Sequence, residues 1–385
     1  MKANDLPALN LLRFVAALYI VLFHFDHTFV PPALHGLLSR GPSVTSLFFV
    51  LSGFLLMHVY GRRTLDDAGQ RRFVGRRLAR IVPPNLLGLA LFLLIQAGMG
   101  STTVSMNDVL QAGLLIQTWT VGASHILNAP AWSMSCLLFF YLCFPVLAPR
   151  LTQLRTRTLA ALMTALWLVG AGLPLLLAGL PGVFLPDDWT TYLHNAPLLR
   201  LPAFVAGMGL AVLYARHGGI PARWGAVTVL GTLALMVILP QEALRVNNEV
   251  FLPLVLLVVL AFANPGRRIG RLGNSRTVRA LANASICIYM VHFSVQGWLT
   301  QQALPHLGLT WSAWTILAYL LIVVTGSVVA DRWLCRPLTR LLTRTASVPP
   351  HLPVPASILH PNCSLPTLTT SLAEPIIPET VRSTA

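Results

Sequence analysis

Two basic side chains share an apolar segment near the start of the chain. The segment LLRFVAALYIVLFHF, residues 11–25, carries Arg13 near one end and His24 near the other. Eleven residues make about three helical turns, so a helix would place both side chains on one face, roughly 16 Å apart. A central arginine costs ~2.5 to 3.5 kcal/mol on membrane-insertion scales, which indicates that this face meets something polar. His24 is a candidate general base, because an ordinary imidazole, with a pKa of about 6.5, can accept a proton at neutral pH. The alternative is that both side chains only extend to the two membrane surfaces.

A second pair of cations lies in RRFVGRRLARIVPP, residues 71–84. Arg77 and Arg80 are three residues apart, so a helix would bring them to one face. Because guanidinium groups bind phosphates bidentately, we predict that this pair holds a phosphorylated ligand. We also expect Pro83 and Pro84 to break the chain after the pair. The alternative is topological, since arginines at a membrane surface also anchor orientation and bind anionic lipid.

Other polar residues within apolar segments are candidates as well. Arg200 and His292 would be ionisable groups inside a membrane, and such groups are functional hypotheses by default. Ser52 and Gly53 interrupt LFFVLSGFLL, and such a pair of small residues predicts close helix packing. Ser52 is not a predicted nucleophile, because the sequence places no base beside it. Since neither an HxxxH nor an HExxH spacing occurs, we expect no metal site.

These side chains need membrane helices to position them. The chain has 385 residues, of which 55% are hydrophobic and 10% charged, against ~25% charged in ordinary globular domains. Apolar blocks recur at 8–28, 43–60, 84–99, 132–149, 158–180, 197–216, 223–240, 250–264, 279–300 and 311–334. We therefore predict an all-α fold, a polytopic membrane helix bundle with about ten transmembrane helices, over residues 1–345. Residues 346–385 are rich in Pro, Ser and Thr and are expected to form a disordered cytoplasmic tail.

The net charge of +15 is concentrated in alternate connections between these blocks. Arginines follow the second, fourth, sixth, eighth and tenth blocks, whereas the other connections carry only Arg40 and Arg245. The positive-inside rule then places both termini in the cytoplasm. We expect a multi-pass protein of the bacterial cytoplasmic (inner) membrane, with the lipid bilayer as a partner. Nucleic acid is not an expected partner, because no soluble basic domain with exposed aromatic residues is present.

Six motifs, in order along the chain, resemble the acyltransferase type 3 family of bacterial membrane O-acyltransferases over roughly residues 6–342. They are LRFVAALYIVLFHF with Arg13 and His24, SLFFVLSGFLL from Phe48 to Leu55, FVGRRLARIVP with Arg77 and Arg80, APAWSMSCLLFFYLCFP with Trp132, Ser133, Ser135, Phe140, Tyr141 and Pro145, LLRLPAFVAGMGL with Arg200, Phe204 and Gly207, and ASICIYMVHFSV with Ser285, Tyr289 and His292. Each motif alone is weak, but six at suitable spacings are a strong signal.

The resemblance implies transfer of an acyl group, usually acetyl, from cytoplasmic acyl-CoA to a hydroxyl of a cell-envelope glycan or glycolipid, such as polysaccharide or lipopolysaccharide. His24 would be the general base, Arg13 would steer the donor into the bundle, and Arg77 with Arg80 would bind its phosphates. No cofactor would be bound; acyl-CoA, usually acetyl-CoA, is a co-substrate. The supporting residues would be Ser52, Trp132, Ser133, Arg200, Tyr289 and His292.

Two departures from the family pattern keep other functions open. Leu137 and Cys335 stand where many members carry a glutamate. Loss of the first acid removes a group that could position the acceptor or handle a proton, so a non-catalytic relative of the family is one alternative. The other is a transporter or flippase for an anionic lipid or glycan, since a basic path also suits a moving anion. Against transport, the chain shows no matching halves with broken helices.

Overall fold

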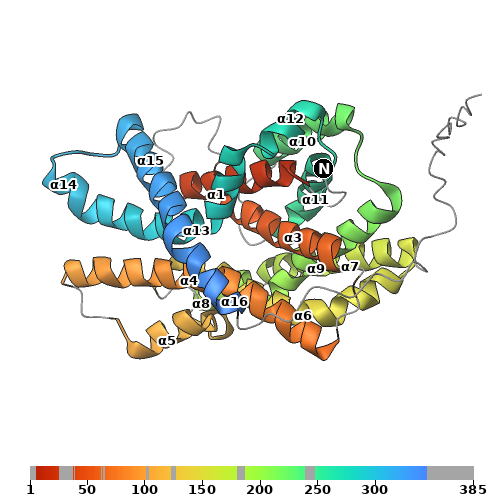
Figure 1. The fold of residues 1–385 in the computed structure, drawn as a ribbon, viewed down its shortest axis with the longest axis horizontal. Helices are drawn as coiled ribbons and strands as arrows, with labels where there is room; N and C mark the ends of the chain where they lie inside the picture. Colours follow the sequence, from red (N-terminus) through yellow and green to blue (C-terminus); the bar gives the residue numbers. More distant parts are fainter. Residues whose placement is uncertain are drawn as a thin grey trace, which may run out of the picture. The chain divides into compact units, whose positions relative to one another are not determined.

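The computed structural model describes residues 6–25, 38, 40–61, 63, 66–100, 104–122, 127–179, 187–238 and 248–344. The described residues contain helices and connections but no strand, as the apolar blocks predict (Figure 1). A helix satisfies its own backbone hydrogen bonds, which hydrocarbon cannot do, so this architecture suits a membrane. The predicted tail lies outside the described residues, and the boundary at residue 345 stays a prediction.

Within the described residues, each of the ten apolar blocks overlaps one long helix. These helices are α1 (Ala8–Phe23), α3 (Gly41–Tyr60), α4 (Asp67–Gly98), α6 (Trp132–Gln153), α7 (Thr156–Gly179), α9 (Pro197–His217), α10 (Ala222–Ile238), α11 (Leu252–Ala263), α13 (Arg276–Trp298) and α15 (Ala313–Ala330). Shorter helical segments connect or extend them: α5 (Met106–Leu114), η3 (Ala129–Ala131), α8 (Asp187–Asn195), η5 (Asn248–Phe251), α12 (Arg267–Gly273), η6 (Leu299–Ala303), α14 (Leu304–His306), η7 (Asp331–Cys335) and α16 (Arg336–Arg344).

The chain is a multi-pass membrane protein. Within the described residues, six helical segments are long and apolar enough to cross a bilayer: Gly41–Tyr60, Asp67–Gly98, Ala129–Gln153, Thr191–His217, Arg276–His306 and Ala313–Thr343. A pair bent by 91°, Glu249–Ala263 with Arg267–Gly273, would make a seventh span if it counts as one. The helix Ala8–Phe23 is apolar but shorter than these spans. The count of ten transmembrane helices therefore stays a prediction.

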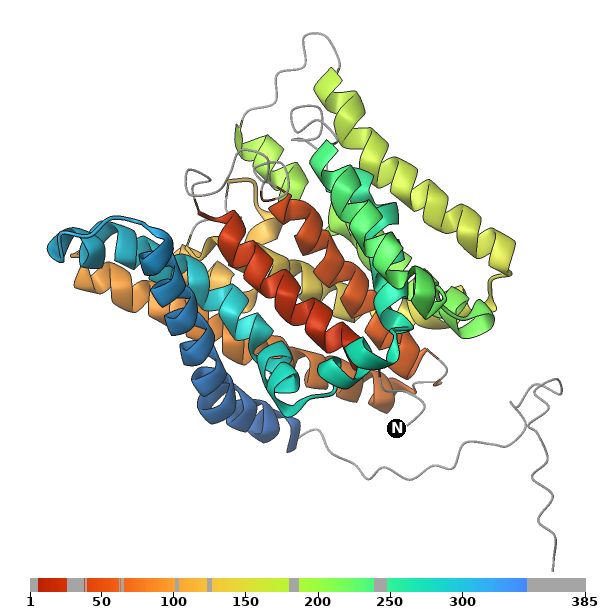
Figure 2. The ribbon, with the colours of Figure 1, turned by 90° about the horizontal axis from the view of Figure 1, so that it is seen from above.

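Helices α1 and α3 are held by contacts with distant parts of the chain. Figure 2 shows α1 beside α3, and α1 also packs against α13. The backbones of α3 and α9 come unusually close. A Cβ atom on Gly53 would lie 2.1 Å from the carbonyl oxygen of Phe204, and one on Gly207 would lie 2.2 Å from that of Val50. Only glycine fits at such a crossing, so Gly53 provides the close packing predicted for this segment.

The expectation that Pro83 and Pro84 break the chain is wrong. The helix α4 runs through both prolines as a single element, so Arg77 and Arg80 lie inside a helix that begins at Asp67. Pro83 cannot donate the usual backbone hydrogen bond to the carbonyl of Ala79, four residues earlier. The hydroxyl of Thr339 on α16 donates to that carbonyl instead, at 2.8 Å. A distant helix thus satisfies the acceptor that the proline leaves open.

Candidate active site

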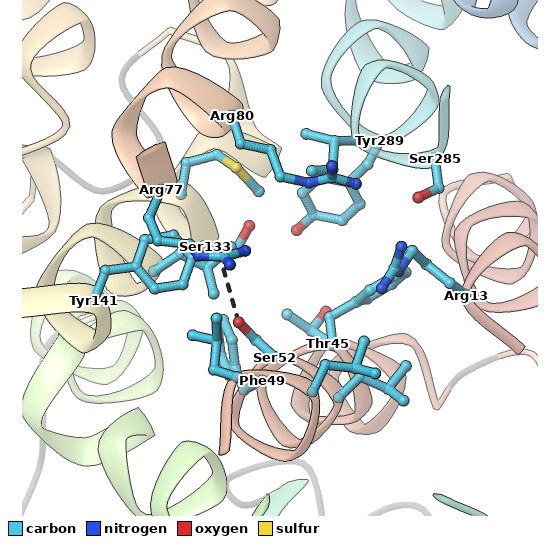
Figure 3. Close-up of a pocket in the computed structure, with 17 residues that line it drawn as sticks. Arg13, Thr45, Phe49, Ser52, Arg77, Arg80, Ser133, Tyr141, Ser285 and Tyr289 are labelled. Carbon is cyan, nitrogen blue, oxygen red and sulfur yellow. Dashed lines mark hydrogen bonds between the residues drawn. The ribbon is translucent and has the colours of Figure 1, made fainter. Parts of the chain in front are cut away.

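A cavity of ≈ 120 Å³ lies where α1, α3, α4, α6 and α13 meet, and we call it the arginine cavity (Figure 3). The predicted site residues among those that line it are Arg13, Ser52, Arg77, Arg80, Ser133 and Tyr289. They come from five helices that are spread over most of the chain. The structure therefore brings together the two cationic motifs that the sequence presents more than sixty residues apart.

Three guanidinium groups point into the arginine cavity (Figure 3). Arg13 extends from α1, and Arg77 and Arg80 extend from α4. Among the described residues no aspartate or glutamate lines this cavity, and the buried Nε atom of Arg77 has no hydrogen-bond partner. The guanidinium of Arg77 lies over the ring of Tyr60, 5.1 Å from its centroid, which fixes its plane. Three like charges in a cavity whose described walls hold no carboxylate make a site for a multiply charged anion.

Hydroxyl groups and apolar side chains form the remaining wall. Ser52 donates to the Tyr141 hydroxyl at 3.5 Å, and the hydroxyl of Ser133 donates to the carbonyl of Pro130 at 3.1 Å. Leu137, the first departure from the family pattern, also lines the arginine cavity. The residue therefore presents an apolar surface to the ligand space where many family members would present a carboxylate.

A second cavity of ≈ 200 Å³, the histidine cavity, adjoins the first. Its walls include His24, Trp132, His194 and Asn195. Thr45 and Tyr289 line both cavities, so these two side chains form the partition between them. The hydroxyl of Tyr289 interacts with the side chains of Thr45 and Ser133. The distribution agrees with the sequence prediction that one face of α1 presents a cation at one end and an imidazole at the other.

His24 forms a pair with His292 that fixes which ring nitrogen carries a proton. The Nδ1 atom of His292 lies 2.8 Å from the carbonyl oxygen of Tyr289; a carbonyl only accepts, so this nitrogen is protonated and the Nε2 atom of a neutral His292 is an acceptor. That Nε2 atom is 3.2 Å from His24 Nδ1, which also approaches the carbonyl of Ile20 at 2.8 Å. His24 therefore carries its proton on Nδ1, and its Nε2 atom, which bonds to none of the described residues, keeps a lone pair for a substrate.

The histidine pair is held by contacts with its neighbours. His292 is fully buried, and the hydroxyl of Tyr319 donates to its carbonyl at 3.0 Å. Gln296 donates to the carbonyl of His24 at 2.9 Å. The rings of His24 and Phe293 are in edge contact, with centroids 5.5 Å apart. These contacts hold α1 and α13 in the register that the histidine pair requires.

Arg200 lies outside both cavities. Its Nη1 atom forms an ion pair with Glu249 Oε1 at 2.9 Å, and its Nε atom donates to the carbonyl of His194. Ser46 donates to the same carboxylate oxygen at 3.1 Å. Because Ser46 belongs to α3, Arg200 to α9 and Glu249 to η5, the ion pair ties three segments together behind the histidine cavity. Any catalytic contribution of Arg200 stays a prediction.

Several site residues were not singled out from the sequence. Thr45 precedes Ser52 by seven residues, or two helical turns, so helical spacing alone could have placed both on one face. Gln296 follows His292 by four residues and could have been found in the same way. Glu249 could not, since its partner Arg200 is 49 residues away. Among the described residues no cluster of three or more His, Cys, Asp or Glu side chains could hold a metal ion.

The fold and the site together define a multi-pass helical membrane protein with a cationic cavity beside a histidine pair. The chain belongs to the acyltransferase type 3 family, whose model, described as an acyltransferase domain, matches residues 6–332. A relative is the protein named acyltransferase MdmB from Streptomyces mycarofaciens, 29% identical over 316 residues, which cover 75% of this chain and 79% of the relative. No solved structure matches.

Proposed function

We propose that this protein is a membrane O-acyltransferase that moves an acyl group, most simply acetyl, from acyl-CoA to a hydroxyl of a cell-envelope glycan or glycolipid. The observation that carries this proposal is the pair of adjoining cavities: among the described residues, one is lined by three guanidinium groups and by no carboxylate, and the other by the imidazole of His24. Membership of an acyltransferase family supports the class of reaction.

In this scheme the arginine-rich end of the bundle faces the cytoplasm of a bacterial inner membrane, and both termini lie on that side. Acyl-CoA enters from there, and Arg77 and Arg80 bind its phosphates. Arg13, on the opposite wall, draws the donor inward (Figure 3). The acceptor hydroxyl enters the histidine cavity from the other side, and the thioester lies at the partition made by Thr45 and Tyr289.

The transfer step needs a base at the acceptor and a donor of hydrogen bonds at the carbonyl. His24 Nε2 removes the hydroxyl proton while the acceptor oxygen attacks the thioester carbonyl carbon. The carbonyl oxygen becomes an oxyanion, which the Tyr289 hydroxyl stabilises. The C–S bond then breaks, the ester is formed, and the proton on His24 passes to the leaving thiolate, giving CoA as the free thiol. Positioned acid–base catalysis of this kind contributes typically 10² to 10⁴-fold to a rate.

The base is tested with inverted membrane vesicles that receive acetyl-CoA labelled in the acetyl group. We expect label to enter alkali-labile material with the wild-type protein and transfer to fall about 10² to 10⁴-fold with His24→Gln. His306→Gln is the matched control, because His306 is exposed and lines neither cavity. Equal transfer by wild type and His24→Gln would remove His24 from the reaction. No transfer by inserted wild type supplied with acceptor glycan would favour the transport or non-catalytic alternatives and point to Leu137.

The donor site is tested in the same vesicles. Arg77→Ala and Arg80→Ala should raise the KM for acetyl-CoA at least about tenfold, since each variant removes a charged hydrogen-bond donor. Arg76→Ala is the control, because Arg76 lies on the same helix, is exposed and does not line the cavity. An unchanged KM in both cavity variants would contradict the assignment of phosphate binding to this pair.

A further inference from the structure

A third cavity, of ≈ 250 Å³, adjoins the arginine cavity, and we call it the α16 cavity. Arg80 and Ile286 line both cavities, so the two spaces meet at these side chains. The remaining walls include Asp331 and Cys335 of η7 and three residues of α16: Arg336, Thr339 and Arg340. A ligand that contacts Arg80 from the arginine cavity can therefore continue past it into a second basic space.

The face that α16 turns toward this cavity is set by its spacing and by one hydrogen bond. Arg336, Thr339 and Arg340 are three and four residues apart and share one side of the helix. Thr339 is fixed against α4 by its hydrogen bond to the carbonyl of Ala79, the residue before Arg80. The anchoring keeps the two arginines of α16 beside the arginine of α4.

Three guanidinium groups meet one carboxylate in the α16 cavity. Asp331 is paired with Arg336, with 2.6 Å between Oδ2 and Nε. Within the described residues neither Arg80 nor Arg340 forms an ion pair. The described walls of the cavity thus carry a net positive charge, with Arg80 at the junction with the arginine cavity. Guanidinium groups in this arrangement favour phosphate groups over neutral ligands.

We propose that the α16 cavity binds the nucleotide end of the acyl-CoA donor, with Arg336 and Arg340 on its 3′-phosphate, while the diphosphate lies at the junction on Arg80 and Arg77. This inference rests on the proposed function. The pantetheine arm then runs from this diphosphate through the arginine cavity toward the partition at Tyr289. The recognised chemistry is a phosphate ester, which an anionic lipid headgroup also carries, so the experiment separates the two sources.

The experiment measures binding of acetyl-CoA, 3′-dephospho-acetyl-CoA and acetyl-pantetheine to the full chain in phosphatidylcholine nanodiscs with and without phosphatidylglycerol. We expect Arg340→Ala to reduce the preference for acetyl-CoA over acetyl-pantetheine about tenfold. The double variant Asp331→Asn/Arg336→Gln should do the same without leaving an unpaired carboxylate. Arg332→Ala is the control and should bind like wild type, because Arg332 is exposed, stacks on Trp333 and does not line the cavity.

The outcomes separate this site from the proposed function. Acetyl-CoA binding by wild type with an unchanged preference in both variants overturns the nucleotide site and leaves the proposed function standing. Equal weakening of all three donors also overturns it, since that result indicates a general structural effect. Variants that change only the response to phosphatidylglycerol assign the cavity to a lipid headgroup instead. Wild type that binds no acetyl-CoA overturns the proposed function and this site together.

Discussion

His24 and His292 depend on each other because a neutral imidazole has one donor and one acceptor. The His24 Nδ1 proton faces two acceptors, the carbonyl of Ile20 at 2.8 Å and His292 Nε2 at 3.2 Å, and the carbonyl of Tyr289 holds His292 in the accepting tautomer at 2.8 Å. We therefore treat His292 as a positioning residue that keeps the Nε2 lone pair of His24 available. A carboxylate often does this for a catalytic histidine, whereas within the described part of the chain an imidazole and a backbone carbonyl face His24 Nδ1.

His292→Gln and His292→Leu separate positioning from simple packing. The glutamine oxygen can accept the His24 Nδ1 proton, whereas leucine fills similar space and accepts nothing. We expect the leucine variant to lower kcat at least about tenfold, with the KM for acetyl-CoA unchanged, and the glutamine variant to recover part of that loss. Steady-state kinetics in inverted vesicles measure both constants. Equal loss in the two variants would show that His292 contributes only packing.

The helices could be predicted from the sequence, because a helix satisfies the backbone hydrogen bonds of an apolar segment in hydrocarbon. Each apolar block overlaps a helix in the described part of the chain. The continuation of α4 through its two prolines could not be predicted, because the partner of the Ala79 carbonyl is Thr339, 260 residues later. The same limit applies to the site. The motifs and their spacing identified Arg13, Arg77 and Arg80 as candidate site residues, but only the fold shows that they share one cavity.

The crossing of α3 and α9 gives a stability prediction at the scale of these elements. Gly53→Ala places a methyl group 2.1 Å from the carbonyl oxygen of Phe204, so the helices must separate, at a cost of about 1 to 3 kcal/mol. We expect a lower midpoint of thermal unfolding for the detergent-solubilised protein. Gly231→Ala in α10 should leave the midpoint unchanged or raise it, because nothing lies within 4 Å of the added atom. Equal midpoints for the two variants would contradict the close crossing.

At the scale of the whole molecule, the proposed function requires donor and acceptor to reach the two adjoining cavities from opposite sides of the membrane. The prediction is that acetyl-CoA supports transfer when it reaches the arginine-rich face, as in inverted vesicles, and fails when it is supplied to sealed right-side-out vesicles. Permeabilising the right-side-out vesicles with detergent should restore transfer. Similar rates in both sealed preparations would contradict the sidedness that the arginine distribution predicts.

The unneutralised guanidinium groups also bear on what must not cross the membrane. An enzyme that admits a reactant from each side comes close to being a pore, and a leak of protons or metal ions through it would dissipate the membrane potential. Arg13, Arg77 and Arg80 repel such cations, as an arginine does in selective channels. Thr45 and Tyr289 stand between the two cavities and so between the two proposed entrances. In the proposed function, the positive charge that attracts the donor therefore also opposes a leak of cations across the membrane.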